Sequence, residues 1–252
     1  MCICAWNWQP DSQEPLLLIA NRDEFYQRPA TAAHFWPESP SLFAGQDLQA
    51  GGSWMGASLN GKIALVTNYR SMPMAAARRS RGDLIRDYLG TDSSAHQFVH
   101  QLRPQDYQGY NLLLLDDNGL HYHSNRGQTT VTTLEPGLYG LSNHLLDTPW
   151  PKVERLKRGL SENLAVGSDK ALLALLRDPT QATAAALPST GVPASMEQLL
   201  SSIFIHSDQY GTRNSSVLRL NQSGELRWLE QSYNQHGAGL LQQHQLQLPQ
   251  RR

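Results

Sequence analysis

The residue of this sequence best suited to chemistry is the cysteine at position 2. Removal of Met1 would leave Cys2 with both a thiol and a free α-amine. A thiolate is a strong nucleophile near neutral pH, and an α-amine with a pKa of about 7.7 to 8.0 can act as its general base. A cysteine, as a small residue, is also typical of a core position, so Cys2 alone does not indicate a catalytic site.

Three other polar residues could complete a site around such a cysteine. Asn68 follows the apolar run 63–67, and Asn143 follows Leu141-Ser142 at the end of another expected strand. A side-chain amide in this position can donate to an oxyanion or can cap its own turn. Arg213 lies between two expected strands, where it could hold an acid or orient an α-amine. Their spacing in the sequence does not by itself show that these groups lie together in the fold.

An expected hairpin at the start of the chain places an acid near Cys2. Residues 1–8 alternate in the manner of a strand, and residues 15–20 return as an apolar strand after a turn at 10–12. The end of the second strand carries Asn21-Arg22-Asp23-Glu24. We therefore expect Asp23 to lie near Cys2.

The rest of the chain predicts an α+β protein. The predicted helices span 80–102, 150–163 and 172–177. The further predicted strands span 54–58, 62–67, 111–116, 119–124, 201–206, 214–220 and 226–231. Strands followed by helices and then by strands favour antiparallel sheets with helices on the outside. We expect one domain over residues 1–240 and a frayed, glutamine-rich tail over 241–252.

Composition excludes several classes of protein. The chain has 252 residues and a formal net charge of -1, with no basic stretch longer than Arg78-Arg79-Ser80-Arg81, which argues against nucleic-acid binding. It has neither an apolar stretch of membrane-spanning length nor a basic start typical of a secretory signal, so we expect a cytoplasmic protein without an integral membrane segment. Both cysteines fall within the first four residues, and the nine histidines show no metal spacing. We expect no disulfide and no metal site.

Short motifs run through the chain in order and carry a family resemblance. They are Met1-Cys2, Asn21-Arg22-Asp23-Glu24-Phe25 with Arg28-Pro29, Gly51-Gly52-Ser53-Trp54, Thr67-Asn68-Tyr69-Arg70, Ser80-Arg81-Gly82, Leu141-Ser142-Asn143, Leu146-Asp147-Thr148-Pro149-Trp150-Pro151, Ser202-Ile203-Phe204-Ile205 and Gly211-Thr212-Arg213. On these motifs the chain resembles the NRDE family, also called the Transport and Golgi Organisation protein 2 family. That family is in turn similar to choloylglycine hydrolases and penicillin acylases, which are N-terminal-nucleophile (Ntn) hydrolases. The resemblance implies a four-layer αββα sandwich of antiparallel sheets flanked by helices.

The same resemblance implies roles for individual residues. It makes Cys2 the nucleophile and Asp23 the acid that holds its α-amine. It makes Asn68 and Asn143 the donors on the oxyanion side, and Arg213 the group that tunes the thiol.

One position departs from the hydrolase pattern. Those hydrolases carry an arginine three residues before the aspartate, where this chain has Ala20. Arg22 is adjacent to Asp23, so it points to the opposite face of the strand from Asp23 and is no simple substitute. The departure weakens the case for amidase activity.

Two functions remain open, and they share one pocket. The first is a carrier that binds and traffics an amphipathic anion; the family association favours haem, with acyl-CoA or another lipid as a further candidate. The second is a cysteine hydrolase that cleaves an amide or thioester with Cys2. Neither function requires a cofactor, because haem would be a transported ligand. The sequence also has no Cys-X-X-Cys-His motif for covalent attachment of haem. Candidate ligand-binding residues are Asn21, Arg22, Glu24, His34, Trp54 and Arg70; iron could take Cys2, Cys4 or His34 as an axial ligand.

Overall fold

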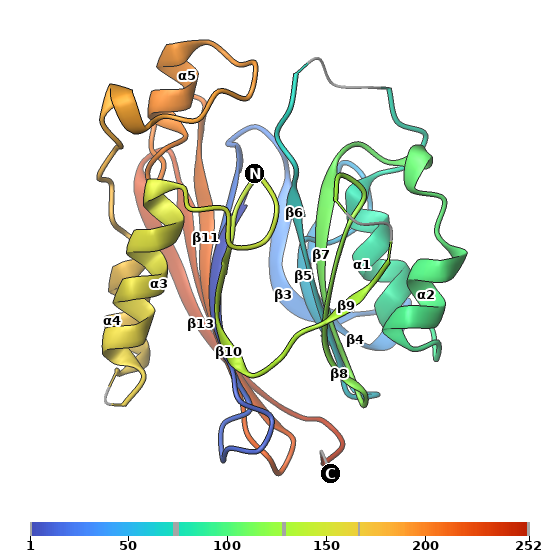
Figure 1. Cartoon of the computed structure of the whole chain (residues 1–252). Helices are drawn as coiled ribbons and strands as arrows, with labels where there is room; N and C mark the ends of the chain where they lie inside the picture. The colour runs from blue at the N-terminus through green and yellow to red at the C-terminus, as the bar shows by residue number, and fades with distance from the viewer. Residues whose placement is uncertain (1, 73–75, 128–129, 166, 251–252) are drawn as a thin grey trace.

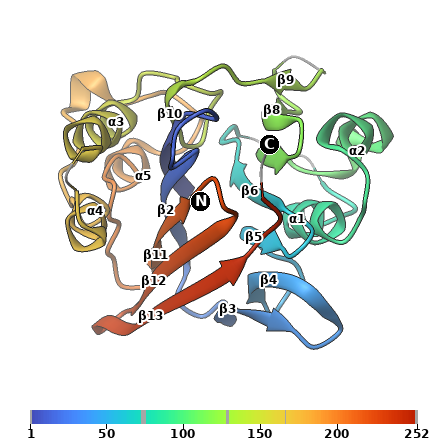
Figure 2. The ribbon, with the colours of Figure 1, turned by 90° about the horizontal axis from the view of Figure 1, so that it is seen from below.

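The structure, a computed structural model, consists of two antiparallel sheets that face one another with helices on both outer sides (Figure 1). It describes residues 2–72, 76–127, 130–165 and 167–250. Helices α3 (Pro151–Asn163), α4 (Asp169–Leu175) and α5 (Ala194–Leu199) lie on one side, and α1 (Arg81–Leu89) and α2 (Ala95–Gln101) on the other (Figure 2). The predicted α+β class with αββα layers is confirmed.

The first sheet has six strands in the order β10-β1-β2-β11-β12-β13. Their bounds are β1 Cys2–Trp8, β2 Leu16–Phe25, β10 Gly137–Leu141, β11 Tyr210–Leu220, β12 Glu225–Asn234 and β13 Gly237–Gln247. The predicted hairpin at the start of the chain is present as β1 and β2. Because β2 also pairs with β11, the start of the chain lies well inside the sheet.

The second sheet has seven strands in the order of the chain. Their bounds are β3 Ala30–Trp36, β4 Ser39–Asp47, β5 Met55–Ser58, β6 Lys62–Asn68, β7 Tyr110–Asp116, β8 Gly119–Ser124 and β9 Thr132–Thr133. Two short 3-10 helices, Pro104–Asp106 and Ala184–Ala186, lie in connecting segments. The predicted strand pairs around Asn60-Gly61 and Asp117-Asn118 are present as β5–β6 and β7–β8.

Alternation along β1 decides which side of the sheet each residue faces. Cys4, Trp6 and Trp8 belong to the apolar core between the two sheets. Ile3 and Ala5 instead pack in the core under α3 and α4. Side chains at even positions of this strand therefore face the second sheet.

Two predicted elements differ in the structure. The predicted helix over 80–102 is two helices, because α1 ends at Leu89 with Gly90 as its C-cap, and Ser94 is the N-cap of α2 in a capping box with Gln97. The predicted strand over 201–206 is absent: this segment makes only an isolated bridge between His206 and Gly211, and the strand itself starts at Tyr210.

The tail prediction is also wrong over most of its length. Residues 237–247 form β13, which pairs with β12, and Leu246 and Leu248 are buried. Pairing with β12 satisfies the backbone hydrogen-bonding groups of the tail, and the two buried leucines anchor it to the core. The glutamine-rich composition was therefore a wrong indication of fraying. Residues 251–252 and Met1 lie outside the described residues.

A close contact between two glycines joins helix α1 to the loop before β5. A Cβ atom at Gly52 would contact the carbonyl carbon of Gly82 and lie 2.7 Å from its Cα. The Ser53 amide donates to the Gly82 carbonyl oxygen at 3.1 Å in the same place. The absence of both Cβ atoms therefore lets the start of α1 approach the middle of the molecule.

We predict that Gly52→Ala lowers the free energy of unfolding by about 1–3 kcal/mol, since the backbone of Gly82 cannot move aside as a side chain can. Urea denaturation followed by circular dichroism measures this. Gln49→Ala is the matched control in the same loop, because Gln49 is exposed and only its backbone amide bonds to Asp47. Equal stability of the two variants would show that the glycine contact does not constrain the fold.

Candidate functional site

A cavity of about 90 Å³ lies at Cys2, where the motifs of the chain meet. Its lining comes from the start of β1, the end of β2, the β4–β5 loop, β6 and the start of α1. The lining residues are Cys2, Arg22, Asp23, Glu24, Arg28, Asp47, Ser53, Trp54, Val66, Asn68, Ser80, Arg81 and Gly82. Five segments that are distant in the sequence therefore build one site.

Strand register places Arg22 on the same side of the sheet as Cys2. The two residues are direct partners in the antiparallel pair β1–β2, and such partners have side chains on one face. The Arg22 guanidinium stacks 4.2 Å from the Trp54 ring centroid and lies 3.5 Å from an Asp47 carboxylate oxygen. Arg22 points away from the Asp23 side, as expected, and its charge acts on the Cys2 thiol.

Burial and charge act on the thiol in opposite directions. Cys2 is 9% exposed, and burial raises the pKa of its thiol. The negative charge of Asp23 raises the same pKa further, and the positive charge of Arg22 lowers it. Nearby positive charge therefore favours the thiolate form, which burial disfavours.

Arg81, from the Ser80-Arg81-Gly82 motif, is a second cation in the cavity. It is the first residue of α1, and its Nη1 donates to the Gly109 carbonyl at 3.3 Å. In the part of the chain that the structure describes, Arg81 forms no salt bridge. Arg28, a third cation in the lining, is paired with Asp47 at 2.6 Å. Among the described residues, Arg81 is therefore the cation of this cavity without a salt bridge, although the charge of Glu24 acts on it.

Asp23 lies on the helix side of the sheet with a buried lysine. Its Oδ1 accepts a hydrogen bond from Thr212 Oγ1 at 2.8 Å. Burial raises the pKa of the Asp23 carboxyl, and the charge of Lys152 lowers it. Lys152 itself is fully buried, and burial lowers its pKa to about 8. Asp23 is thus a buried acid one residue from Arg22, the strand partner of Cys2, with the charge of Lys152 acting on it.

Sequence reasoning did not identify Lys152, although a signal was present. Lys152, Leu156 and Leu160 recur at intervals of four, which places the lysine on the buried face of α3. A charged residue on the apolar face of a helix needs an internal partner. Its Nζ donates to the Leu200 carbonyl at 2.9 Å.

The two predicted oxyanion donors occupy different places. Asn68 lines the cavity. Asn143 is fully buried behind it, and its Nδ2 donates to the Asn68 backbone carbonyl at 3.1 Å. The neighbouring Ser142 hydroxyl donates to the Cys2 carbonyl at 3.1 Å. Asn68 is therefore placed to contact a ligand, whereas Asn143 supports the backbone around it.

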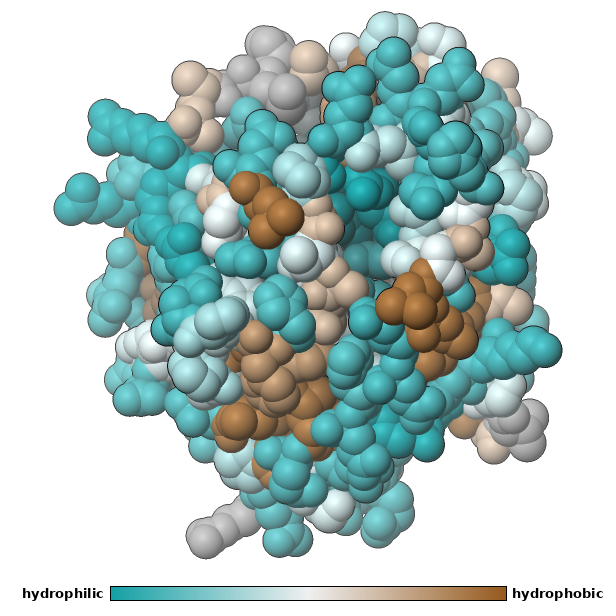
Figure 3. Space-filling model, turned by 180° about the vertical axis from the view of Figure 1, so that it is seen from behind, coloured by the Kyte–Doolittle hydropathy of each residue, from teal (hydrophilic) through white to brown (hydrophobic). Residues whose placement is uncertain are grey.

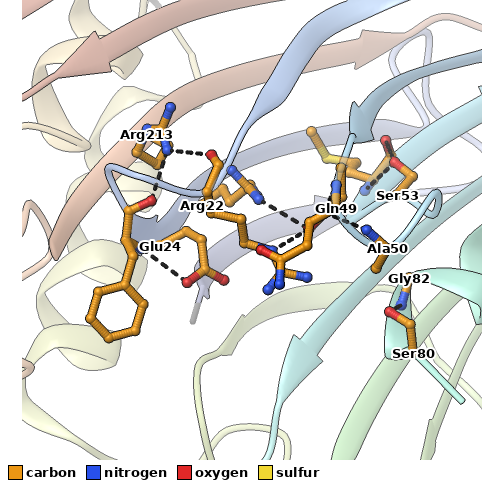
Figure 4. A network of polar contacts seen from close by, with 12 residues as sticks. Arg22, Glu24, Gln49, Ala50, Ser53, Ser80, Gly82 and Arg213 are labelled. Atoms are coloured by element: carbon orange, nitrogen blue, oxygen red, sulfur yellow. Dashed lines mark hydrogen bonds and ion pairs between the residues drawn. The ribbon is translucent and has the colours of Figure 1, made fainter.

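Arg213 binds backbone rather than the thiol. Its Nη1 donates to the carbonyl oxygens of Phe25, Tyr26 and Arg28 at 2.9, 3.3 and 3.0 Å. Figure 4 shows the guanidinium directed at this segment, with Glu24 and Arg22 nearby. Arg213 is not part of the cavity lining. The structure thus gives it the role of holding the turn after β2, not the predicted position beside Cys2.

Three predicted ligand-binding residues also lie away from the cavity. Asn21 points to the helix side and donates to the Leu176 and Ile203 carbonyls. Arg70 forms a buried ion pair with Glu197 at 3.1 Å. His34 lies on β3 with its Nδ1 2.9 Å from the carbonyl oxygen of Ala32. The other three candidates, Arg22, Glu24 and Trp54, line the cavity.

The described residues contain no group of three or more histidine, cysteine or acidic side chains arranged to hold a metal ion. Within the same ranges, no helix is long and apolar enough to cross a membrane.

Comparison with known proteins identifies the family. The family model described as Transport and Golgi organisation 2 matches residues 1–235. The chain belongs to this family. It is 32% identical to the Transport and Golgi organization protein 2 homolog of Bos taurus, over 92% of this chain and 93% of that protein. It is 31% identical to the homolog of Homo sapiens with the same coverage.

Two solved structures are similar to the chain at low sequence identity. One is a Caenorhabditis elegans N-acylethanolamine-hydrolyzing acid amidase ortholog, with a TM-score of 0.49, 12% identity and coverage of 86% of this chain and 92% of that one. The other is the C2A mutant of a conjugated bile acid hydrolase from Clostridium perfringens, with a TM-score of 0.43, 9% identity and coverage of 98% and 92%. The Transport and Golgi organisation 2 match spans every residue of the Cys2 cavity.

We predict that Arg22→Gln slows alkylation of Cys2 by iodoacetamide at pH 7.5 by about a factor of ten, because loss of the positive charge raises the pKa of the thiol and lowers its thiolate fraction. Mass spectrometry of the labelled peptide over a pH series measures the rate. Cys4 does not interfere, since it is fully buried and burial raises its pKa. Arg78→Gln, an exposed change, is the control; an equal rate in Arg22→Gln and the wild type would contradict the assignment.

Proposed function

We propose that this chain binds an amphipathic anion by its charged end in the Cys2 cavity and carries it, with haem as the first candidate and acyl-CoA as the second. The observation that carries the proposal is Arg81, a guanidinium in the cavity lining without a salt bridge among the described residues. Together with Arg22 it offers charge-assisted hydrogen bonds to a carboxylate or phosphate beside the thiol.

The size of the cavity indicates which part of such a ligand enters. At about 90 Å³ it is smaller than the roughly 300–1,000 Å³ of sites that enclose whole ligands, so it accepts a haem propionate or a phosphate group and leaves the remainder outside. Cys4 faces the buried core and His34 lies elsewhere on β3, so neither adjoins the cavity.

Apolar surface beside the cavity suits the rest of the ligand. Phe25 and Leu48 are 55% and 53% exposed, and each follows directly after a cavity-lining residue, Glu24 or Asp47. The face opposite that of Figure 1 is mostly hydrophilic, with hydrophobic residues in a few separate patches (Figure 3). The porphyrin face or acyl chain would pack on these two residues.

We predict that haem binds saturably and that Arg81→Gln weakens the affinity about tenfold, because one charge-assisted hydrogen bond is lost. The change of the Soret band on titration measures the dissociation constant, and acyl-CoA competition tests whether both ligands use one site. Arg86→Gln is the matched control on the same helix, since Arg86 pairs with Asp83 and Asp87 outside the cavity. The carrier proposal fails if haem does not saturate or if both variants bind alike.

A cysteine hydrolase is the second candidate, and the position of Asp23 favours it. The buried carboxylate lies beside the start of β1, where it can hold the α-ammonium group that removal of Met1 would create. The Cys2 sulfur would then form a bond to the acyl carbon while its proton passes through the α-amine to the leaving amine or thiol. The C–N or C–S bond breaks, Asn68 stabilises the oxyanion, and water hydrolyses the thioester.

This second candidate predicts an acyl adduct on Cys2 after incubation with acyl-CoA or an N-acyl amine, detected by intact mass and absent in Cys2→Ala. Asp23→Asn should slow adduct formation about a hundredfold, because the α-amine loses the carboxylate that orients it. Absence of an adduct in a wild-type protein whose Met1 has been removed would exclude the hydrolase function for these substrates.

A further inference from the structure

The six-stranded sheet ends in a long strand whose outer edge is open. β13 is the last strand of this sheet, and its neighbour in the sheet is β12 (Figure 2). The register between them is unbroken from Leu241 to Gln247. Every second residue of such a strand turns its N–H and C=O groups away from its neighbour. Among the described residues, no backbone hydrogen bond joins 241–247 to any element other than β12, so these outward groups have no partner within the chain.

The other three sheet edges are protected against pairing. β9 has only two residues, and the register of β3 with β4 is broken twice. On β10, the Gly140 amide and carbonyl both bond to Asp147 at 2.9 Å. Short strands, bulges and covering loops are the means by which native proteins prevent pairing at an edge. β13 has one irregularity, opposite Gln231 to Tyr233, and 241–247 lies beyond it. Within the described ranges, this stretch is the long edge without such protection.

The composition of β13 omits a further protection, which is charge. Its sequence, GAGLLQQHQLQ, contains no lysine, arginine, aspartate, glutamate or proline. The His244 ring packs 4.9 Å from the Phe43 ring, and burial lowers the pKa of His244, so this side chain is neutral at neutral pH. Charged side chains and proline usually prevent an exposed edge strand from pairing with another chain.

The same composition favours a second copy of this chain as the partner. In a two-fold antiparallel pair, residues near the axis meet residues of the same short stretch on the other chain, so a charge there would lie close to a like charge. β13 carries none. A glutamine amide both donates and accepts, so Gln242, Gln243 and Gln245 suit hydrogen bonding to their own copies. Leu241, which is 52% exposed, adds apolar surface.

We propose that the edge of β13 over residues 241–247 binds a second copy of this chain by antiparallel pairing, so that two six-stranded sheets join into one. Seven extended residues give a paired stretch of about 23 Å. β13 contributes no residue to the lining of the Cys2 cavity. The inference is therefore independent of the proposed function and of any ligand at Cys2.

Sedimentation velocity of the ligand-free protein over a series of micromolar concentrations tests the proposal. We expect reversible association to twice the monomer mass, and equal association of Cys2→Ala under reducing conditions. Gln243 is exposed, and its partner on β12 is the uncharged Leu229. Gln243→Lys and Gln243→Glu should each raise the dimer dissociation constant about fivefold, because like charges then meet across the pair. An equimolar mixture of these two variants should restore association, since opposite charges then meet.

Gln235→Lys is the matched control, because it adds the same charge on the exposed turn before β13. Hydrogen exchange of the wild type is a second measurement that needs no variant. Amides of 241–247 should exchange more slowly as the protein concentration rises, whereas amides of β10 should not change. A protein that stays monomeric would overturn the proposal. So would a dimer that Gln243→Lys and Gln235→Lys affect equally, or one that leaves the exchange of 241–247 unchanged.

Discussion

The antiparallel pairing of β1 with β2 is the constraint on which the site depends. It sets Cys2 opposite Arg22, so thiol and guanidinium share the face toward the second sheet. The same register sends Asp23 to the helix side, where it accepts a hydrogen bond from Thr212. A slip by one residue would exchange the two faces and leave the thiol without its cation.

Contacts with the second sheet and with helix α1 bring the remaining residues to the site. The Gly52–Gly82 approach brings the first turn of α1, and with it Arg81, to the Cys2 cavity. Trp54 follows in the same loop and supports Arg22 by stacking on it. Cys2 and Arg22 from the first sheet and Arg81 from α1 therefore line a single cavity.

Local pattern was enough to predict the layers and the first hairpin, because period-two alternation and turn residues are local signals. It also led to Cys2, Asp23 and Asn68. It failed where long-range packing decides the outcome. Asn21 and Arg213 were predicted as site residues, but their side chains donate to backbone carbonyls elsewhere. Arg81 and the β13 tail acquire their positions only through contacts with distant segments.

The most direct test of the central claim, that the charged end of a ligand lies beside the Cys2 thiol, is protection of Cys2 from iodoacetamide by haem or acyl-CoA. We expect the alkylation rate to fall as ligand saturates, with a midpoint equal to the dissociation constant and shifted in parallel by Arg81→Gln. An unchanged alkylation rate at saturating ligand would place the ligand elsewhere and contradict the account.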